Sequence, residues 1–180
     1  METDLAHLAD LSLNYSEVGA TGHSLPTDAR HLARRVTIGR GPDVFARAAD
    51  ALMTWRMHTG AGLSVRATAA RAAVGVNVLI GVGPAWAQLR VPCRVLHVID
   101  QPDRVGFTYG TLHGHPVAGE ESFSVLLADD QVSFVVIGFT RPTRSATGLA
   151  LRASGPIGRA VNDRILDRYG TALQRAGRGD

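Results

Sequence analysis

The side chains best suited to chemistry lie in one fifteen-residue stretch, from Tyr109 to Phe123. It contains a tyrosine, a threonine, two histidines and two adjacent glutamates. Glycine and proline interrupt these side chains, which predicts a turn between two strands, and binding sites are often built on such rims. We therefore expect a functional site near this turn. The stretch completes no metal, nucleotide or nucleophile motif, so it does not name a reaction.

The first half of this stretch predicts a strand with one face turned inward. Because side chains alternate along a strand, Val105, Phe107, Tyr109 and Thr111 share a face. A phenol and a hydroxyl at the end of an apolar wall could hold a ligand oxygen or donate a proton. The other interpretation of Tyr109 is a buried tyrosine bonded to a backbone carbonyl.

His115 precedes a pair of glutamates, one of which should face the same side as Phe123. By alternation that residue is Glu121 rather than Glu120. A carboxyl group in an apolar cavity beside an imidazole could share general acid and base duties near neutral pH. The alternative is a solvated glutamate pair with a histidine that caps the turn. Arg141 is predicted to pair with one of the two glutamates as a structural bridge.

The end of the first predicted helix carries a second group of polar side chains. Trp55, Arg56 and His58 offer an aromatic wall, an anion clamp and a titratable group. Trp55 continues the apolar stripe and is predicted to belong to the core, whereas Arg56 and His58 either cap the helix or reach the turn. Tyr15, near the N-terminus, could close one end of a cavity.

Motifs for metals and nucleotide cofactors are incomplete. His113, His115 and Glu120 resemble the first metal motif of cupins, but no histidine follows His115 to supply the later ligand. We therefore expect no metal, although a site of two histidines and one carboxylate stays open. The glycines near 39–41 and 81–83 form neither a phosphate loop nor a dinucleotide motif, and no Gly-x-Ser-x-Gly elbow is present. No cofactor is predicted.

The composition is that of an ordinary globular chain. Its 180 residues, 45 % of them hydrophobic, suffice for one core that buries about 70 % of the unfolded surface. No stretch approaches the roughly 18 apolar residues of a membrane span, and the first residues carry acids where a signal peptide carries bases. We expect a cytoplasmic protein that binds no membrane, with Cys93 as a buried small hydrophobe.

All 19 basic residues are arginine and the formal net charge is +3. Several arginines gather near the C-terminus, but Asp163 and Asp167 interrupt them. This pattern favours a solvated helix face over binding to nucleic acid.

The order of elements predicts an α+β chain with one domain over residues 1–180. Residues 1–33 form an N-terminal wrapping segment, residues 34–142 a strand, a helix and antiparallel strands, and residues 143–176 a C-terminal helical region. An apolar stripe from Val44 to Met57 predicts the first helix, and Ile157, Val161, Ile165, Leu166, Tyr169 and Leu173 have the spacing of a long last helix. Seven short runs predict strands: 35–39, 63–68, 77–82, 91–99, 104–111, 121–127 and 132–140.

Several segments resemble a mainly bacterial family known as domain of unknown function 1990. They span nearly the whole chain: Asn14–Thr21, Ile38–Gly41, Trp55–His58, Gly106–Leu112, Gly114–Pro116, Gly119–Glu121 with Phe123, and Arg141–Pro142. The family carries no activity, so the resemblance implies no reaction. The chain departs from the usual pattern at Thr27–His31 and after Pro142, which could mark a retuned pocket.

The order of elements also resembles the helix-grip fold of pollen-allergen-like proteins, lipid-transfer domains and polyketide cyclases. There a curved antiparallel sheet of about seven strands wraps the last helix and leaves a cavity between them. The alternative is a closed barrel with two flanking helices.

The fold resemblance implies a polyketide- or lipid-like ligand, apolar but oxygenated, in an internal cavity. We expect cofactor-independent acid–base chemistry on it, such as cyclisation, isomerisation, dehydration or hydrolysis. Tyr109, His115 and Glu121 are the predicted catalytic residues, and the predicted ligand-binding residues are Trp55, Arg56, His58, Phe107, Thr111, Glu120 and Tyr15. Two alternatives stay open: a non-catalytic carrier or sensor, and an interaction module that uses the arginine-bearing last helix. The chain is expected to be a monomer or a homodimer.

Overall fold

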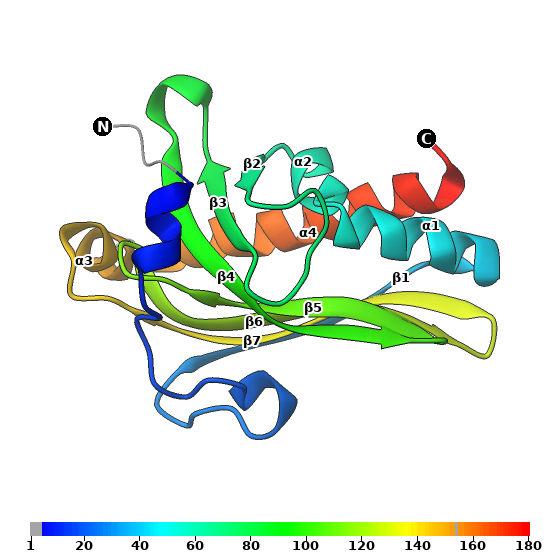
Figure 1. The fold of residues 1–180 in the computed structure, drawn as a ribbon, viewed down its shortest axis with the longest axis horizontal. Helices are drawn as coiled ribbons and strands as arrows, with labels where there is room; N and C mark the ends of the chain where they lie inside the picture. The colour runs from blue at the N-terminus through cyan, green and yellow to red at the C-terminus, as the bar shows by residue number, and fades with distance from the viewer. Residues whose placement is uncertain (1–4, 154) are drawn as a thin grey trace.

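A seven-stranded antiparallel sheet forms the centre of the computed structural model, which describes residues 5–153 and 155–180 (Figure 1). The strands lie in the order β1-β7-β6-β5-β4-β3-β2, so the first strand pairs with the last. All seven predicted strands are present. Their bounds are Arg30–Arg40 (β1), Ser64–Ala67 (β2), Asn77–Val82 (β3), Leu89–Gln101 (β4), Arg104–Thr111 (β5), Val117–Ala128 (β6) and Gln131–Pro142 (β7).

One long helix, α4 (Pro156–Arg178), runs along one face of the sheet, and α1 (Pro42–Met53) and α2 (Arg56–Gly60) pack against it. A shorter helix, α3 (Ala146–Ala153), lies between β7 and α4. Strands β1 and β2 are the two edges of the sheet, so the alternative of a closed barrel is wrong. The predicted helix-grip arrangement is confirmed.

The predicted first helix is interrupted at Trp55, which separates α1 from α2. Trp55 adopts the left-handed conformation with φ 65°, which costs a non-glycine residue about 1–2 kcal/mol. Its indole Nε1 donates a hydrogen bond to the Ala69 carbonyl at 3.1 Å, and its ring packs edge-on against Phe107. These contacts offset the strain. The break redirects the chain, so that His58 enters the core rather than extending the helix surface.

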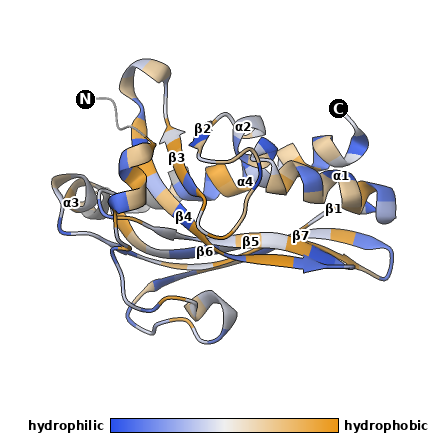
Figure 2. Ribbon diagram, viewed as in Figure 1, coloured by the Kyte–Doolittle hydropathy of each residue, from blue (hydrophilic) through white to orange (hydrophobic). Residues whose placement is uncertain are grey.

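The main core lies between the sheet and the three helices α1, α2 and α4. Apolar and polar residues alternate along α1 and α4, as amphipathic helices require (Figure 2). On α4 the predicted apolar positions Leu166, Tyr169 and Leu173 are buried, and Ile165 packs against the core. The side chains of Ile157 and Val161 lie outside the described part of the chain.

The segment before β1 passes to the face of the sheet opposite α4 (Figure 1). It contains two short 3₁₀ helices, Ala6–Asp10 and Ala20–Gly22. Leu8 of the first packs against Leu79 and Leu112 in a small second cluster of buried residues. The face of the sheet that carries Glu120 is therefore covered by residues from the beginning of the chain.

Candidate functional site

A cavity of about 440 Å³ lies between the sheet and α4. Most of its wall is apolar, with contributions from Leu32, Leu63, Ile80, Val91 and Leu166. Pockets of roughly 300–1,000 Å³ with apolar walls and a few polar groups are typical of small-molecule sites. The cavity therefore has the size and surface needed for an organic ligand.

Two strands and the last helix bring three polar side chains to the inner part of this wall. Tyr109 on β5 lies opposite Glu121 on β6, and the Tyr109 hydroxyl donates a hydrogen bond to Glu121 Oε2 at 3.2 Å. Tyr169 of α4 lies near both residues. Tyr109 and Glu121 both line the cavity, on the side that alternation along the strands predicted. The Tyr109 hydroxyl bonds to this carboxyl group and not to a backbone carbonyl, as the alternative interpretation had it.

The environment of this cluster favours the neutral form of each group. Burial raises the pKa of Glu121, and the hydrogen bond from Tyr109 opposes part of that shift. The carboxyl group nevertheless remains accessible from the cavity, because Glu121 is only partly covered by other side chains. Burial and the nearby charge of Glu121 raise the pKa of Tyr109 well above its usual value. A buried carboxylic acid of this kind can donate a proton to a ligand oxygen.

His115 lies in the turn between β5 and β6 and lines the cavity. Its Nδ1 accepts a hydrogen bond from the Val117 backbone N–H at 3.1 Å. Burial lowers its pKa to about 4, so the ring is neutral near pH 7 with its proton on Nε2. Among the described residues, Glu121 bonds to Tyr109 and not to His115. The structure therefore does not form the predicted histidine–glutamate pair, and the imidazole caps the turn.

Glu120 borders the cavity, but its carboxylate is directed to the opposite face of the sheet. Its oxygens accept hydrogen bonds from the Tyr15 hydroxyl at 2.9 Å, from the Gly19 N–H at 2.5 Å, and from Thr21. The Tyr15 hydroxyl can lie close to the strand here because the residue beneath it is Gly110, where a Cβ atom would lie 2.2 Å from that hydroxyl. Glu120 and Tyr15 were expected to contact the ligand, and this expectation is wrong. They bind each other instead and attach the N-terminal segment to the sheet.

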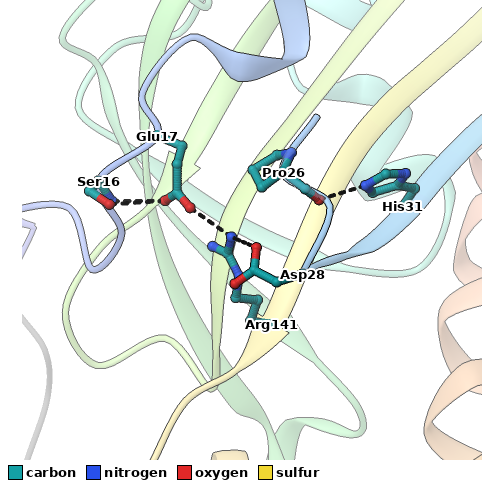
Figure 3. Close-up of polar contacts among 6 residues, drawn as sticks. All are labelled: Ser16, Glu17, Pro26, Asp28, His31 and Arg141. Atoms are coloured by element: carbon teal, nitrogen blue, oxygen red, sulfur yellow. Dashed lines mark hydrogen bonds and ion pairs between the residues drawn. The ribbon is translucent and has the colours of Figure 1, made fainter. Parts of the chain in front are cut away.

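Arg141 does not pair with either adjacent glutamate, contrary to prediction. Its guanidinium bridges Glu17 at 2.6 Å and Asp28 at 2.5 Å (Figure 3). In the same view, a hydrogen bond of 2.7 Å joins His31 Nε2 to the Pro26 carbonyl oxygen. The arginine lowers the pKa of Glu17 to about 2. Both acids come from the segment before or at the start of β1, so Arg141 holds the same segment as Glu120.

Besides Tyr15, four predicted ligand-binding residues lie outside the cavity wall. Trp55 and Phe107 are core residues, as was expected of Trp55. Arg56 forms an ion pair with Asp50 at 2.5 Å on the surface. His58 is fully buried behind Tyr109, with both ring nitrogens unpaired among the described residues.

Thr111 lines the cavity as predicted, but its hydroxyl is engaged within the protein. Oγ1 donates to the Asn14 side chain at 2.6 Å and accepts from the Gly119 N–H at 2.9 Å. Cys93 is buried, as expected, and also lines the cavity. Thr111 therefore shapes the wall more than it offers a free hydrogen-bonding group.

The sequence did not single out several polar residues of the cavity wall. These are Arg30 and Thr140 on the two paired strands β1 and β7, and Asn162 and Tyr169 on α4. Tyr169 was detectable from its helical spacing, but only as an apolar position. Arg30 was placed in the wrapping segment, because the predicted first strand began at residue 35 rather than at residue 30.

Within residues 5–153 and 155–180, no group of three or more His, Cys, Asp or Glu side chains is arranged to hold a metal ion. No helix there combines the length and the apolar character needed to cross a membrane.

Comparison with known proteins supports both the fold and the family. A UPF0548 protein of Deinococcus radiodurans is 32 % identical over 174 residues, which cover 91 % of this chain and 86 % of that protein. The crystal structure of Ara h 8.0201 has a TM-score of 0.58 at 8 % identity, covering 84 % of this chain and 99 % of the other. A point mutant of norcoclaurine synthase from Thalictrum flavum, solved with a transition-state analogue, has a TM-score of 0.52 at 8 % identity and covers 83 % and 96 %.

These solved structures share the helix-grip fold with this chain. At such low sequence identity the similarity shows the fold alone. Residues 14–172 match the family described as Domain of unknown function (DUF1990), which includes the segments quoted above from Asn14 to Pro142. The chain belongs to the DUF1990 family.

Proposed function

We propose that the cavity binds an apolar small molecule with an oxygen function, polyketide- or lipid-like in character. Tyr109 and Glu121 would then act on it as an acid–base pair without a cofactor. The observation that carries this proposal is the pairing of the two side chains on the wall of a cavity of about 440 Å³. In one fold neighbour, norcoclaurine synthase, the same fold holds a transition-state analogue.

The chemistry proposed for Glu121 follows from how its two oxygens are used. Oε2 accepts the hydrogen bond from Tyr109, whereas Oε1 has no hydrogen bond with another described residue, and Glu121 lines the cavity. A neutral Glu121 can protonate a ligand carbonyl oxygen, and the resulting carboxylate can remove a proton from a neighbouring carbon. Such a sequence isomerises a ligand with no net oxidation. The same exchange of protons assists cyclisation, dehydration or hydrolysis.

Ligand binding can be tested by filling the cavity from β1. Leu32 lines the cavity, whereas its neighbour Ala33 is exposed and, by alternation along the strand, faces the other side. The neutral fluorophore N-phenyl-1-naphthylamine should bind the wild type, and Leu32→Trp should weaken binding by about tenfold or more because the indole occupies the ligand's space. Ala33→Trp, the matched control, should bind like the wild type. Equal binding by both variants would contradict the proposal.

A test of the proposed catalysis requires the natural ligand. Native mass spectrometry, followed by denaturing extraction of the purified protein, would identify it. Glu121→Gln and Tyr109→Phe should lower turnover of that compound by about 10²–10⁴-fold, the usual contribution of general acid–base catalysis. Both variants should retain the melting temperature within a few degrees and still bind the ligand. Loss of folding together with activity would argue against a catalytic role for the pair.

A second candidate function is that of a non-catalytic carrier or sensor. The observation that favours it is the position of His115, whose Nδ1 is committed to the turn and which does not pair with Glu121. A carrier should release the ligand with its mass and isomeric form unchanged after prolonged incubation. In that case Glu121→Gln should alter affinity alone.

A further inference from the structure

The polar groups of the cavity lie at two levels of the sheet. Arg30 on β1 pairs with Thr140, which pairs with Gly119 on β6. Two residues deeper, Leu32 and Glu121 occupy the corresponding positions. The Arg30 side chain is 45 % exposed, whereas Tyr109, which lies opposite Glu121, is 6 % exposed. Arg30 therefore marks the open end of the cavity, and the tyrosine–glutamate pair marks the deep end.

The distance between these ends suits a ligand of medium length. Arg30 and Glu121 are offset by two residues along the strands and by two strands across the sheet. At about 3.4 Å per residue and about 4.8 Å per strand, their Cα atoms are roughly 12 Å apart. Leu32 and Val117 are among the apolar residues that line the cavity around these levels.

The open end of the cavity carries a cationic side chain. Arg30 contributes a permanently charged guanidinium to the cavity wall, and the carboxylate of Glu120 is engaged on the other face of the sheet. Burial favours the neutral form of Glu121. The ion pair of Arg30 within the described chain is a long contact of 3.9 Å with Asp163, whose side chain is itself more than half exposed. Most of the five N–H groups of Arg30 therefore remain available, in the fork geometry that matches a carboxylate.

We propose that the ligand of this cavity is an amphipathic monocarboxylate, with its carboxylate bound by Arg30 and its apolar body extending toward Tyr109 and Glu121. This inference rests on the proposed function and deepens it by naming the substrate class. It also gives the ligand an orientation, in which the acidic end stays near water. Any further oxygen of the ligand lies at the deep end, beside the acid–base pair.

The test is competition against N-phenyl-1-naphthylamine, which has no acidic group and reports on the cavity alone. Decanoate and decan-1-ol are matched competitors, because they share a ten-carbon chain and differ in the head group. At pH 7.5, decanoate should displace the fluorophore at a concentration about tenfold or more below that of decan-1-ol. Arg30→Gln should abolish this difference and leave fluorophore binding unchanged. Asp163→Asn, which removes the competing anion, should enlarge it.

Arg34→Gln is the matched control for the loss of an arginine on the same strand. Arg34 forms an ion pair with Asp167 at 3.0 Å and does not line the cavity, so the variant should keep the preference for decanoate. Equal competition by acid and alcohol in the wild type, or a preference that survives Arg30→Gln, would overturn the inference while fluorophore binding still supports the cavity. A wild type that binds neither the fluorophore nor either competitor would overturn the proposed function as well.

Discussion

Glu120→Ala is expected to destabilise the protein by about 3 kcal/mol and to release the N-terminal segment from the sheet. Glu120 is 1 % exposed, and its oxygens accept hydrogen bonds from the Tyr15 hydroxyl, from the Gly19 N–H, and from the N–H and hydroxyl of Thr21. A hydrogen bond that involves a charged group contributes about 1.5–3 kcal/mol, and a donor left buried without a partner costs about 1–3 kcal/mol. Part of this loss is recovered because the released donors can bind water.

This loss should lower the melting temperature by roughly 6–12 °C, since about 1 kcal/mol corresponds to 2–4 °C in a domain of this size. Hydrogen exchange should accelerate around residues 12–22, whereas the centres of β5 and β6 stay protected. Tyr15→Phe removes one of the four donors and serves as a graded variant, with an expected loss of about 1 kcal/mol. Unchanged exchange around residues 12–22 in Glu120→Ala would show that other contacts, such as those of Arg141, hold the segment by themselves.

The strands could be predicted from the sequence because their signal is local. Short runs of β-branched and aromatic residues, bounded by turn residues, gave for 77–82 and 104–111 the bounds that the structure shows for β3 and β5. Alternation along the strands placed Tyr109 and Glu121 on the inner face, where they form a hydrogen bond. A period of two residues determines side-chain direction along a strand, so pairs on adjacent strands follow from it.

Contacts between distant segments could not be predicted in this way. Alternation turned Glu120 away from the cavity, but nothing near it in the sequence indicated that Tyr15, 105 positions earlier, would cover it. Arg141 likewise binds Glu17 and Asp28, more than 110 residues away. Such pairings depend on where the N-terminal segment crosses the sheet. That path is decided by packing, as at Gly110, and not by a local pattern.

The break of the first helix has a similar cause. The apolar stripe continues through Trp55 to Met57, so helical spacing alone predicts an unbroken helix. The indole instead bonds the Ala69 carbonyl, a contact that requires the loop before β3 to be in place. Tertiary contacts therefore override the local preference, and His58 becomes a core residue.

His58→Phe is expected to stabilise the protein, most strongly in acid. The imidazole is completely buried, and neither nitrogen has a hydrogen-bond partner among residues 5–153 and 155–180. It packs against the rings of Phe107, Tyr109, Phe123 and Tyr169, with the last centroid at 5.0 Å. A buried polar atom without a partner costs about 1–3 kcal/mol. Phenylalanine fits the same aromatic surroundings without that cost.

The pH dependence follows from the pKa of His58, which burial lowers from 6.5 to about 3. Between these values the unfolded chain binds a proton that the folded chain does not bind. The free energy of unfolding therefore falls as the pH drops from about 6.5 toward 3, at a limiting slope of about 1.4 kcal/mol per pH unit. His58→Phe removes this contribution, so its advantage in melting temperature over the wild type should grow from pH 7 to pH 5.

His97→Gln, at an exposed histidine of β4, controls for the loss of a histidine itself. Because His58 lies behind the cavity wall, His58→Phe should bind N-phenyl-1-naphthylamine within about twofold of the wild type, a difference well below the 1.4 kcal/mol of a tenfold change. Lower stability of His58→Phe at both pH values would mean that the imidazole makes a favourable polar contact in the folded protein. Stabilisation with unchanged binding would instead show that the buried imidazole of His58 destabilises the fold and takes no part in ligand binding, unlike Tyr109 on the cavity wall.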